Sequence, residues 1–249
     1  MVNYNLAVPR AIPESRFQDL IEAATAVLLE QGYRRTQIAD VAERMGVSKG
    51  SIYTYVESKE ALLDCVLRFA DRPAPIALPE ALPVPTPPAG ATLQMVRRKL
   101  ASENALPSLD AALLRKRVVD LRAELEEILA ELYDLLARNR TGIKLLDRCA
   151  PDYPELARVW NRAGREGALA RLSRYLDERA RRGRLRRFTD EPVAARLVLE
   201  TLVFWAVHRH WDPAPQAFDE ASARRTVVEF LASALLSPGS RASSARRGR

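Results

Sequence analysis

The most informative polar side chains lie between positions 48 and 54, in the order Ser-Lys-Gly-Ser-Ile-Tyr-Thr. Lys49 can donate hydrogen bonds to guanine O6 or N7, and Thr54 can contact a base edge or the methyl group of thymine. Gly50 has no side chain that would hold a helix away from the groove of a DNA duplex. These residue types suit recognition of a nucleic acid rather than a bond-making reaction.

These side chains need a short helix that presents them outward, and the residues around them predict one. Ala42 is small enough to lie where two helices cross, and Gly46, four positions later, tolerates the positive φ of a tight turn. Val47 and Ile52 supply apolar side chains that lock the second helix in place, and Ser48 offers an oxygen to its exposed amides. A small residue, a glycine and an apolar lock at these offsets are typical of a helix-turn-helix.

Apolar residues at helical spacing place this pair within a group of four helices. The predicted helices span residues 14–31, 36–45, 48–56 and 58–71. Gly32 ends the first helix, whereas Thr36, Ser48 and Ser58 are predicted to cap the next three.

Residues 14–70 resemble the TetR family of repressors almost end to end. The matching residues are Gly-Tyr at 32–33, Thr36, Ile-Ala-Asp-Val-Ala at 38–42, Gly-Val-Ser-Lys-Gly-Ser-Ile-Tyr at 46–53, Tyr55 and Ser-Lys-Glu-Ala-Leu at 58–62. Val56 stands where the family usually has Phe, which should alter packing rather than DNA contact. Beyond residue 90 the resemblance is looser, in helix lengths and in the phrases at 153–156 and 183–186.

The contacts with DNA are predicted to be of two kinds. Lys49, Gly50 and Thr54 face the major groove, and the family resemblance supports Tyr53 as a further DNA contact. Phosphate contacts, which set register without reading sequence, are expected from Thr36, Ser51, Tyr55 and Lys59, with Ser48 beside them at the start of the recognition helix. Spacing alone leaves other roles open, because the two tyrosines could pack between helices and the two lysines could simply be solvated.

A proline-rich segment divides the chain. Residues 73–88 contain 7 prolines in 16 positions, which predicts an extended, semi-rigid spacer rather than a helix. We therefore expect a DNA-binding domain at 1–72, a linker at 73–89, a helical regulatory and dimerisation domain at 90–237, and a disordered basic tail at 238–249.

The region beyond the linker has helical spacing and no strand pattern, so the predicted fold class is all-α. Its predicted helices span residues 108–138, 142–149, 154–182, 189–211 and 218–236. The first of these carries a heptad seam of apolar residues, as bundle helices do. The last two have apolar residues on more than one face.

The TetR resemblance implies a homodimer formed through the last two long helices as a four-helix bundle. The alternative is that both helices are internal to a monomer. A pocket for a small-molecule effector is expected within the same helices, with candidate lining residues Tyr133, Trp160, Tyr175, Phe204 and His208. Core packing remains an open interpretation for each of these five side chains.

Several function classes find no support in the sequence. Cys65 and Cys149 lie in apolar helical patterns, which predicts buried thiols rather than a disulfide framework. His208 and His210 are two positions apart and lack the i, i+4 spacing of a helical metal pair, so no metal site is expected. No phosphate-binding loop, nucleophile motif, signal peptide or membrane-spanning run is visible, so we expect a cytoplasmic protein that is not an enzyme and needs no cofactor.

Net charge is weaker evidence for DNA binding than the helix-turn-helix motif is. The chain carries a formal charge of +7, but residues 1–72 hold 9 Lys or Arg against 10 Asp or Glu. The helix-turn-helix region is therefore close to neutral, and the positive charge comes from elsewhere.

Together these features predict a repressor that binds a palindromic operator as a homodimer and is released by an unknown small-molecule effector. The fourth helix, at 58–71, joins the two halves and is the expected coupling element. Three alternatives stay open: a C-terminal domain that docks a protein partner, a protein that coats DNA without sequence preference, and a helical enzyme with a chance motif.

Overall fold

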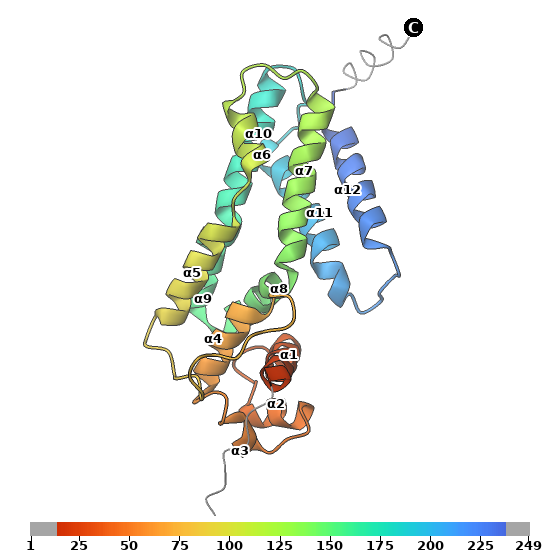
Figure 1. The fold of residues 1–249 in the computed structure, drawn as a ribbon. Coiled ribbons are helices and arrows are strands. Elements are labelled where there is room, and N and C mark those ends of the chain that lie inside the picture. The colour runs from red at the N-terminus through yellow and green to blue at the C-terminus, as the bar shows by residue number, and fades with distance from the viewer. Residues whose placement is uncertain (1–13, 238–249) are drawn as a thin grey trace, which may run out of the picture. The chain divides into compact units, whose positions relative to one another are not determined.

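Helices make up the regular structure of residues 14–237, the part of the chain that this computed structural model describes (Figure 1). Contacts divide the chain into a first unit, Met1–Thr92, and a second unit, Leu93–Arg249. Among the described residues, β-type pairing is limited to two isolated bridges, Val56 with Val84 and Leu185 with Leu236. The predicted all-α fold is confirmed, and the predicted tail at 238–249 lies outside the described residues.

The first unit contains four helices, α1 (Glu14–Gln31), α2 (Ile38–Arg44), α3 (Lys49–Ile52) and α4 (Lys59–Phe69). α1 buries an apolar stripe that repeats at helical spacing, formed by Phe17, Leu20, Ile21, Ala24 and Leu28. α1 packs this stripe against α2 and α4. Most of the core of the unit thus comes from these three helices, and α3 adds the fully buried Ile52 and packs against α2.

One predicted cap in this unit is wrong. Gln37, not Thr36, is the residue before α2, and its amide donates to the carboxylate of Asp40 over 2.8 Å. The Thr36 hydroxyl instead donates to the carbonyl of Gly32 at 2.7 Å, because the turn after α1 buries this side chain. The caps at Ser48 and Ser58 are confirmed, since each serine oxygen accepts a backbone amide of its helix.

The recognition helix is shorter than predicted. α3 ends at Ile52 rather than near Val56, and the chain then turns through residues 53–58 before α4 begins. Val56 is fully buried and forms the bridge to Val84, so it takes part in a contact with the proline-rich segment instead of continuing the helix.

The proline-rich segment forms no helix, but it is not a free spacer. The amide of Val84 donates to the carbonyl of Tyr55 at 2.7 Å, and the amide of Glu57 donates to the carbonyl of Val84 at 3.0 Å. Ile76 is buried, which anchors the earlier part of the segment. Sequence reasoning missed these contacts because they join positions almost thirty residues apart.

The second unit begins with α5 (Ala91–Glu103), whose first residues precede the boundary, and α6 (Pro107–Leu114), followed by α7 (Leu121–Arg138) and α8 (Arg140–Cys149). The predicted single helix at 108–138 is wrong, because residues 115–120 interrupt it. Asp120 caps α7 by accepting the amide of Ala123 at 3.0 Å. The apolar seam is real only from Leu121 onward, since Leu114 is 84% exposed.

The remaining helices match the predicted order with revised ends. Residues 154–181 form one run, made of α9 (Pro154–Val159), a π-helix (Trp160–Glu166) and α10 (Gly167–Arg181). Asp190, rather than Thr189, caps α11 (Glu191–Ala206). A short 3-10 helix (Ala150–Asp152) precedes α9, and another (His208–Trp211) and α12 (Glu220–Leu235) complete the unit.

The core of the second unit lies where α7 and α10 pack on α11, with α12 on α7 and α11. Figure 1 shows α7, α11 and α12 running side by side within this unit. Both cysteines of the chain are buried and neither forms a disulfide, as predicted. Burial is the main reason that the pKa of the Cys65 thiol rises to about 12.

Candidate nucleic-acid interface

The short helix α3 is held in place from its amino-terminal side by the features that the sequence indicated. Gly46 has a φ of +65°, a conformation that side chains other than glycine rarely adopt. Ala42 is buried where α2 contacts α3, and Ile52 is fully buried on the inner face of α3. The Ser48 oxygen accepts the Ser51 amide at 3.2 Å and so fixes the first turn.

With Ile52 inward, the opposite face of the segment is open to solvent. Lys49, Gly50 and Thr54 are exposed, and Tyr53 is 42% exposed. The Thr54 hydroxyl donates to the carbonyl of Ser51 at 2.7 Å. This surface presents a cation, an aromatic ring and a small polar residue around a position without a side chain.

Two of the predicted phosphate contacts do not have exposed side chains. Thr36 is 1% exposed and Tyr55 is 9% exposed. Burial favours a packing role for both side chains, the interpretation that spacing alone had left open for Tyr55. We therefore assign Thr36 and Tyr55 to packing rather than to contact with DNA.

The remaining predicted contacts lie at the two helix starts. The hydroxyls of Ser48 and Ser51 are 2.9 Å apart at the start of α3. The ammonium group of Lys59, the first residue of α4, donates to the carbonyl of Arg34 at 3.2 Å and lies 4.6 Å from the centre of the Tyr33 ring. Lys59 is thus held in a defined position while keeping part of its surface exposed.

In the second unit, the predicted pocket residue Tyr175 belongs to a buried charged cluster. Arg179 and Glu124 are 1% and 3% exposed, and Nη2 of Arg179 lies 3.0 Å from Oε1 of Glu124. The Tyr175 hydroxyl donates to the same oxygen at 3.2 Å, and Arg115 pairs with the other carboxylate oxygen at 2.9 Å. Burial, and then the Glu124 carboxylate, raise the pKa of Tyr175.

Trp160 and His208, two further candidates, meet at Asp147. The indole of Trp160 donates to Oδ1 of Asp147 at 2.7 Å, and Nε2 of His208 lies 3.7 Å from the other oxygen. Burial, followed by the charge of Lys144, lowers the pKa of His208. Gly164 allows this arrangement, because a Cβ there would lie 2.3 Å from ring carbons of Trp160.

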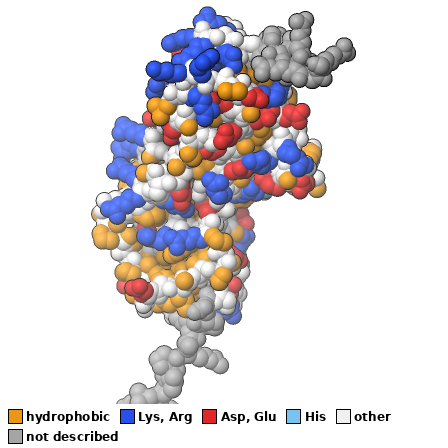
Figure 2. All heavy atoms as spheres, turned by 45° about the horizontal axis from the view of Figure 1, so that its top comes forward, with side chains coloured by type: hydrophobic (Ala, Val, Ile, Leu, Met, Phe, Trp, Pro, Cys, Tyr) orange, Lys and Arg blue, Asp and Glu red, His pale blue; other side chains and the backbone are white. Residues whose placement is uncertain are grey.

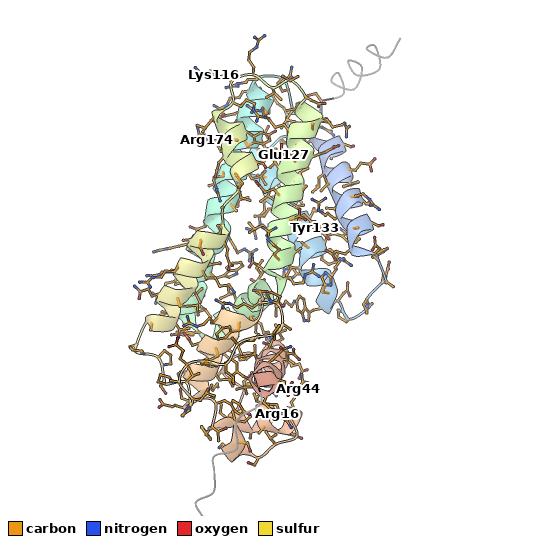
Figure 3. All side chains as sticks on the ribbon, viewed as in Figure 1. Arg16, Arg44, Lys116, Glu127, Tyr133 and Arg174 are labelled. Atoms are coloured by element: carbon orange, nitrogen blue, oxygen red, sulfur yellow. The ribbon has the colours of Figure 1, made fainter. Side chains whose placement is uncertain are left out.

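Tyr133 forms a third group with residues near the start of α12. Its hydroxyl lies 3.1 Å from Oε1 of Glu220 and 3.3 Å from the carbonyl of Trp205 (Figure 3). Arg140 and Arg209 both pair with Glu220. The predicted pocket residues are therefore divided among separate polar groups inside the second unit.

Phe204, the fifth candidate, lies on an exposed apolar stripe. Val193, Leu197 and Phe204 on α11 are 53%, 64% and 43% exposed, and Phe230 on α12 is 67% exposed. Apolar side chains this large and this exposed on two contacting helices are typical of a surface that another chain covers. Phe204 suits that surface better than it suits the wall of an internal pocket.

Charge on the second unit is concentrated at one end. The exposed cations there lie on the turns after α6 and α10: Lys116, Arg117, Arg182, Arg184, Arg186 and Arg187. Figure 2 shows Lys and Arg side chains gathered over this end, and Figure 3 labels Lys116 and Arg174 there.

Two family models match the chain. Residues 20–66 match the model of bacterial regulatory proteins of the tetR family, and residues 123–233 match the C-terminal domain of AefR-like transcriptional repressors.

The chain belongs to the TetR family. The relatives found by the comparisons are regulators rather than enzymes.

Curated relatives match this member of the TetR family over a short stretch. The fatty acid metabolism regulator protein of Bacillus subtilis (strain 168) is 38% identical over 48 residues, 19% of this chain and 25% of that protein. The HTH-type transcriptional repressor KstR2 of Mycobacterium tuberculosis (strain ATCC 25618 / H37Rv) is 41% identical over 54 residues, 22% of this chain and 27% of that protein. The matched region thus spans about a quarter of the length of these relatives.

A solved structure shares the fold over most of the chain. The ketosteroid transcriptional regulator KstR2 of Mycobacterium tuberculosis aligns with a TM-score of 0.52 at 15% identity, covering 89% of this chain and 95% of that one. None of the helices between residues 14 and 237 combines the length and apolar character that a membrane crossing needs. The same stretch holds no group of three or more His, Cys, Asp or Glu side chains placed for a metal ion.

Sequence reasoning about this TetR-family regulator missed the charged residues buried in its second unit. Arg179 was detectable, because it continues the buried spacing of Leu172, Tyr175 and Leu176 on α10. A charge on an apolar stripe predicts a buried partner. Asp147 had no comparable signal, since its partners come from the π-helix and from the segment after α11.

Proposed function

We propose that this TetR-family regulator is a repressor that binds a palindromic operator as a homodimer and is released by a small-molecule effector. One observation carries the DNA-binding part: Lys49, Tyr53 and Thr54 are exposed on one face of a segment whose opposite residue, Ile52, is fully buried. A rod of this kind is what a helix-turn-helix inserts into the major groove.

Each exposed residue has a proposed role. Lys49 reads guanine, Thr54 contacts a base edge or a thymine methyl group, and Tyr53 contacts DNA beside them. Gly50 allows close approach of the helix. Phosphate contacts, which fix the register of the protein on DNA, come from the small hydroxyl residues at the start of α3, Ser48 and Ser51, and from Lys59.

The size of α3 supports a dimer. Lys49–Ile52 is a single helical turn, so one subunit makes few contacts and needs a second subunit on a second half-site for useful affinity. The exposed stripe of Val193, Leu197, Phe204 and Phe230 supplies the surface proposed to meet its copy. Burying these side chains between two identical chains would satisfy a two-fold interface.

The effector is proposed to act on the second unit. Its polar groups around the buried Glu124 and the partly exposed Asp147 and Glu220 offer hydrogen-bonding partners that a bound molecule could displace. To move the regulator from 99:1 in favour of the DNA-binding state to 1:99, the effector must prefer the released state by about 5.5 kcal/mol. The alternative is that the second unit docks a protein partner, for which its exposed apolar and basic residues would be the contact.

DNA binding is tested by footprinting on the DNA that flanks the gene of this protein. We expect a protected, roughly palindromic site for the wild type and a loss of about 1–3 kcal/mol in base discrimination for Lys49→Ala. Lys59→Ala should weaken binding to all sequences and flatten the salt dependence. Lys116→Ala removes an exposed cation of the second unit and is the matched control. Equal effects of Lys49→Ala and Lys116→Ala would sink the proposed role of α3.

Dimerisation is tested separately by sedimentation. Leu197→Glu and Phe230→Glu place charges on the stripe and should give monomers, whereas Leu114→Glu, at an 84% exposed position outside it, should leave the dimer intact. A thermal-shift panel of small molecules, run beside a pull-down from lysate, separates an effector from a protein partner. Stabilisation by a small molecule that also releases DNA supports the effector.

A further inference from the structure

The turn that follows the recognition helix is hydrogen-bonded to the proline-rich segment. The Val84 amide donates to the Tyr55 carbonyl at 2.7 Å, and the Glu57 amide returns a bond to the Val84 carbonyl at 3.0 Å. Two residues after Val84, the Thr86 amide donates to Oε2 of Glu57 at 2.9 Å, and the Thr86 hydroxyl donates to the Ser58 hydroxyl oxygen at 2.8 Å. Four bonds thus join residues 84–86 to residues 55–58.

The same segment is tied to the first unit on either side of this contact. Before it, Ile76 is buried. After it, the hydroxyl of Thr92 donates to Oδ1 of Asp64 on α4 at 2.9 Å, and the other oxygen of Asp64 accepts a bond from Arg68 at 2.9 Å. Residues 76–92 therefore form a strap across the first unit, anchored before, at and after the turn 55–58.

The location of the central contact matters because α3 is too short to hold its own direction. A single helical turn has little stability in isolation, so its orientation depends on its packing against α2 through the buried Ile52 and on what holds its two ends. The Gly46 turn and the Ser48 cap fix its start. Its end leads within a few residues to the Tyr55 carbonyl and to Val56, which is fully buried and bridged to Val84.

We propose that residues 84–86 are a positioning element for DNA recognition. By holding residues 55–58, they fix the end of α3 and hence the direction in which Lys49, Tyr53 and Thr54 point. The strap itself touches no DNA in this proposal. It acts on sequence selectivity, because a recognition helix with a looser end can tilt to accept a wrong base pair. The inference rests on the proposed DNA-binding function and adds residues outside the helix-turn-helix to it.

The test uses two pairs of variants in the full chain. Val84→Pro removes the amide that donates to Tyr55, whereas Val84→Ala keeps it and serves as the matched control. Glu57→Ala removes the acceptor of the Thr86 amide, whereas Glu57→Gln keeps an acceptor oxygen and removes the same charge. The probe is a duplex selected from a random library by the wild type, compared with its single-base-pair variants.

We expect Val84→Pro and Glu57→Ala to lose roughly fivefold in discrimination between the selected duplex and its variants, as the loss of about one hydrogen bond predicts. Val84→Ala and Glu57→Gln keep the hydrogen bonds and should discriminate between the duplexes as the wild type does. The salt dependence of Val84→Pro should equal that of the wild type, since no phosphate contact is lost. Faster exchange of the Glu57 amide in Val84→Pro would report that the turn has loosened.

Four outcomes separate the possible failures. Equal discrimination by both members of each pair, with the Glu57 amide exchanging faster, would show a strap that only stabilises the unit and would overturn the inference. A changed salt dependence in Val84→Pro would overturn it too, because the strap would then contact DNA directly. If Val84→Pro does not fold, the Glu57 pair decides. A wild type that selects no sequence would instead contradict the proposed function.

Discussion

The side chains proposed to bind DNA stand on the surface of an apolar core in the first unit, whereas the second unit encloses charges within its own core. Lys49 and Tyr53 are exposed above Ile52, which is fully buried. In the second unit, Arg179 and Glu124 face each other with 1% and 3% of their side chains exposed. The side chains proposed to bind DNA thus face outward, whereas the ion pair of Arg179 and Glu124 faces inward.

An apolar core and a buried ion pair restrict the structure of a domain in different ways. An apolar core tolerates small changes in shape, and the first unit adds caps, a glycine turn and the strap to fix what the core does not. A buried ion pair demands its partner, because removing one member leaves a charge without water or counter-ion. The second unit is therefore expected to respond sharply to any molecule that disturbs these pairs, which suits a regulatory role.

The largest expected effect is the loss of the buried carboxylate. Glu124→Ala leaves the Arg179 guanidinium buried with only the Ala112 carbonyl at 2.7 Å as a partner on this side. We expect a loss of about 3–5 kcal/mol in the free energy of unfolding, measured by urea denaturation. The double variant Glu124→Leu with Arg179→Met removes both charges and should recover most of that loss. A single variant as stable as the wild type would show that the contrast between the two cores has no energetic meaning.

Helix caps should contribute about equally to the free energy of unfolding in the two units. Ser48→Ala in the first unit and Asp190→Ala in the second each remove a side chain that accepts a backbone amide at a helix start. Each should lower the free energy of unfolding by about 1 kcal/mol. Ser48→Asp and Asp190→Ser keep an acceptor and are the controls. A cap worth much more in one unit would mean that the distinction extends beyond the buried charges.

A pH titration distinguishes the units because both histidines of the chain lie in the second one. Burial lowers the pKa of His208 and of His210 from the ordinary value of 6.5, with the charges of Lys144 and Arg140 next in importance. Since the unfolded chain then binds protons more readily, their contribution to stability is complete above pH 6.5 and is lost as the pH falls below it.

The measurement is tryptophan fluorescence during urea unfolding at pH 7.5 and pH 5.5, since all three tryptophans also belong to the second unit. Stability should be lower at pH 5.5, and the double variant His208→Asn with His210→Asn should reduce that difference. A difference that persists in the double variant would assign the pH effect to other groups.

The smallest effect is expected at the surface of the first unit. Arg44 on α2 pairs with Glu30 on α1, with 38% and 57% of their side chains exposed. Figure 3 shows Arg44 and Arg16 on this unit. Glu30→Ala should change the free energy of unfolding by no more than about 1 kcal/mol, less at high salt. A loss of stability as large as that of Glu124→Ala would show that the exposed ion pair matters as much as the buried one, and would contradict the comparison.

The features that could be predicted from the sequence are those set by neighbours along the chain. The positive φ at Gly46, the caps at Ser48 and Ser58, and the buried position of Ile52 depend on residues within a turn or two. So do the apolar stripes of α1 and α7. These local signals were enough to identify the helix-turn-helix and the helical nature of the second unit.

The features that escaped depend on contacts between distant residues. The break at 115–120 lies within a pattern that reads as one helix, and Arg115 turns back there to reach the Glu124 carboxylate. The prolines of the strap predict that it is not a helix, but only its bonds to residues 55–58 show that it belongs to the first unit. Helix α5 went unassigned because its buried apolar surface is small.

The π-helix at Trp160–Glu166 has a consequence for the register of everything that follows it. A wide turn holds one more residue than an α-helical turn, and each residue of an α-helix rotates its successors by about 100° about the axis. The extra residue therefore sets which way α10 faces. If residues 154–181 formed a regular α-helix without the wide turn, the Arg179 side chain would be rotated about the helix axis, away from Glu124 and out of the interior.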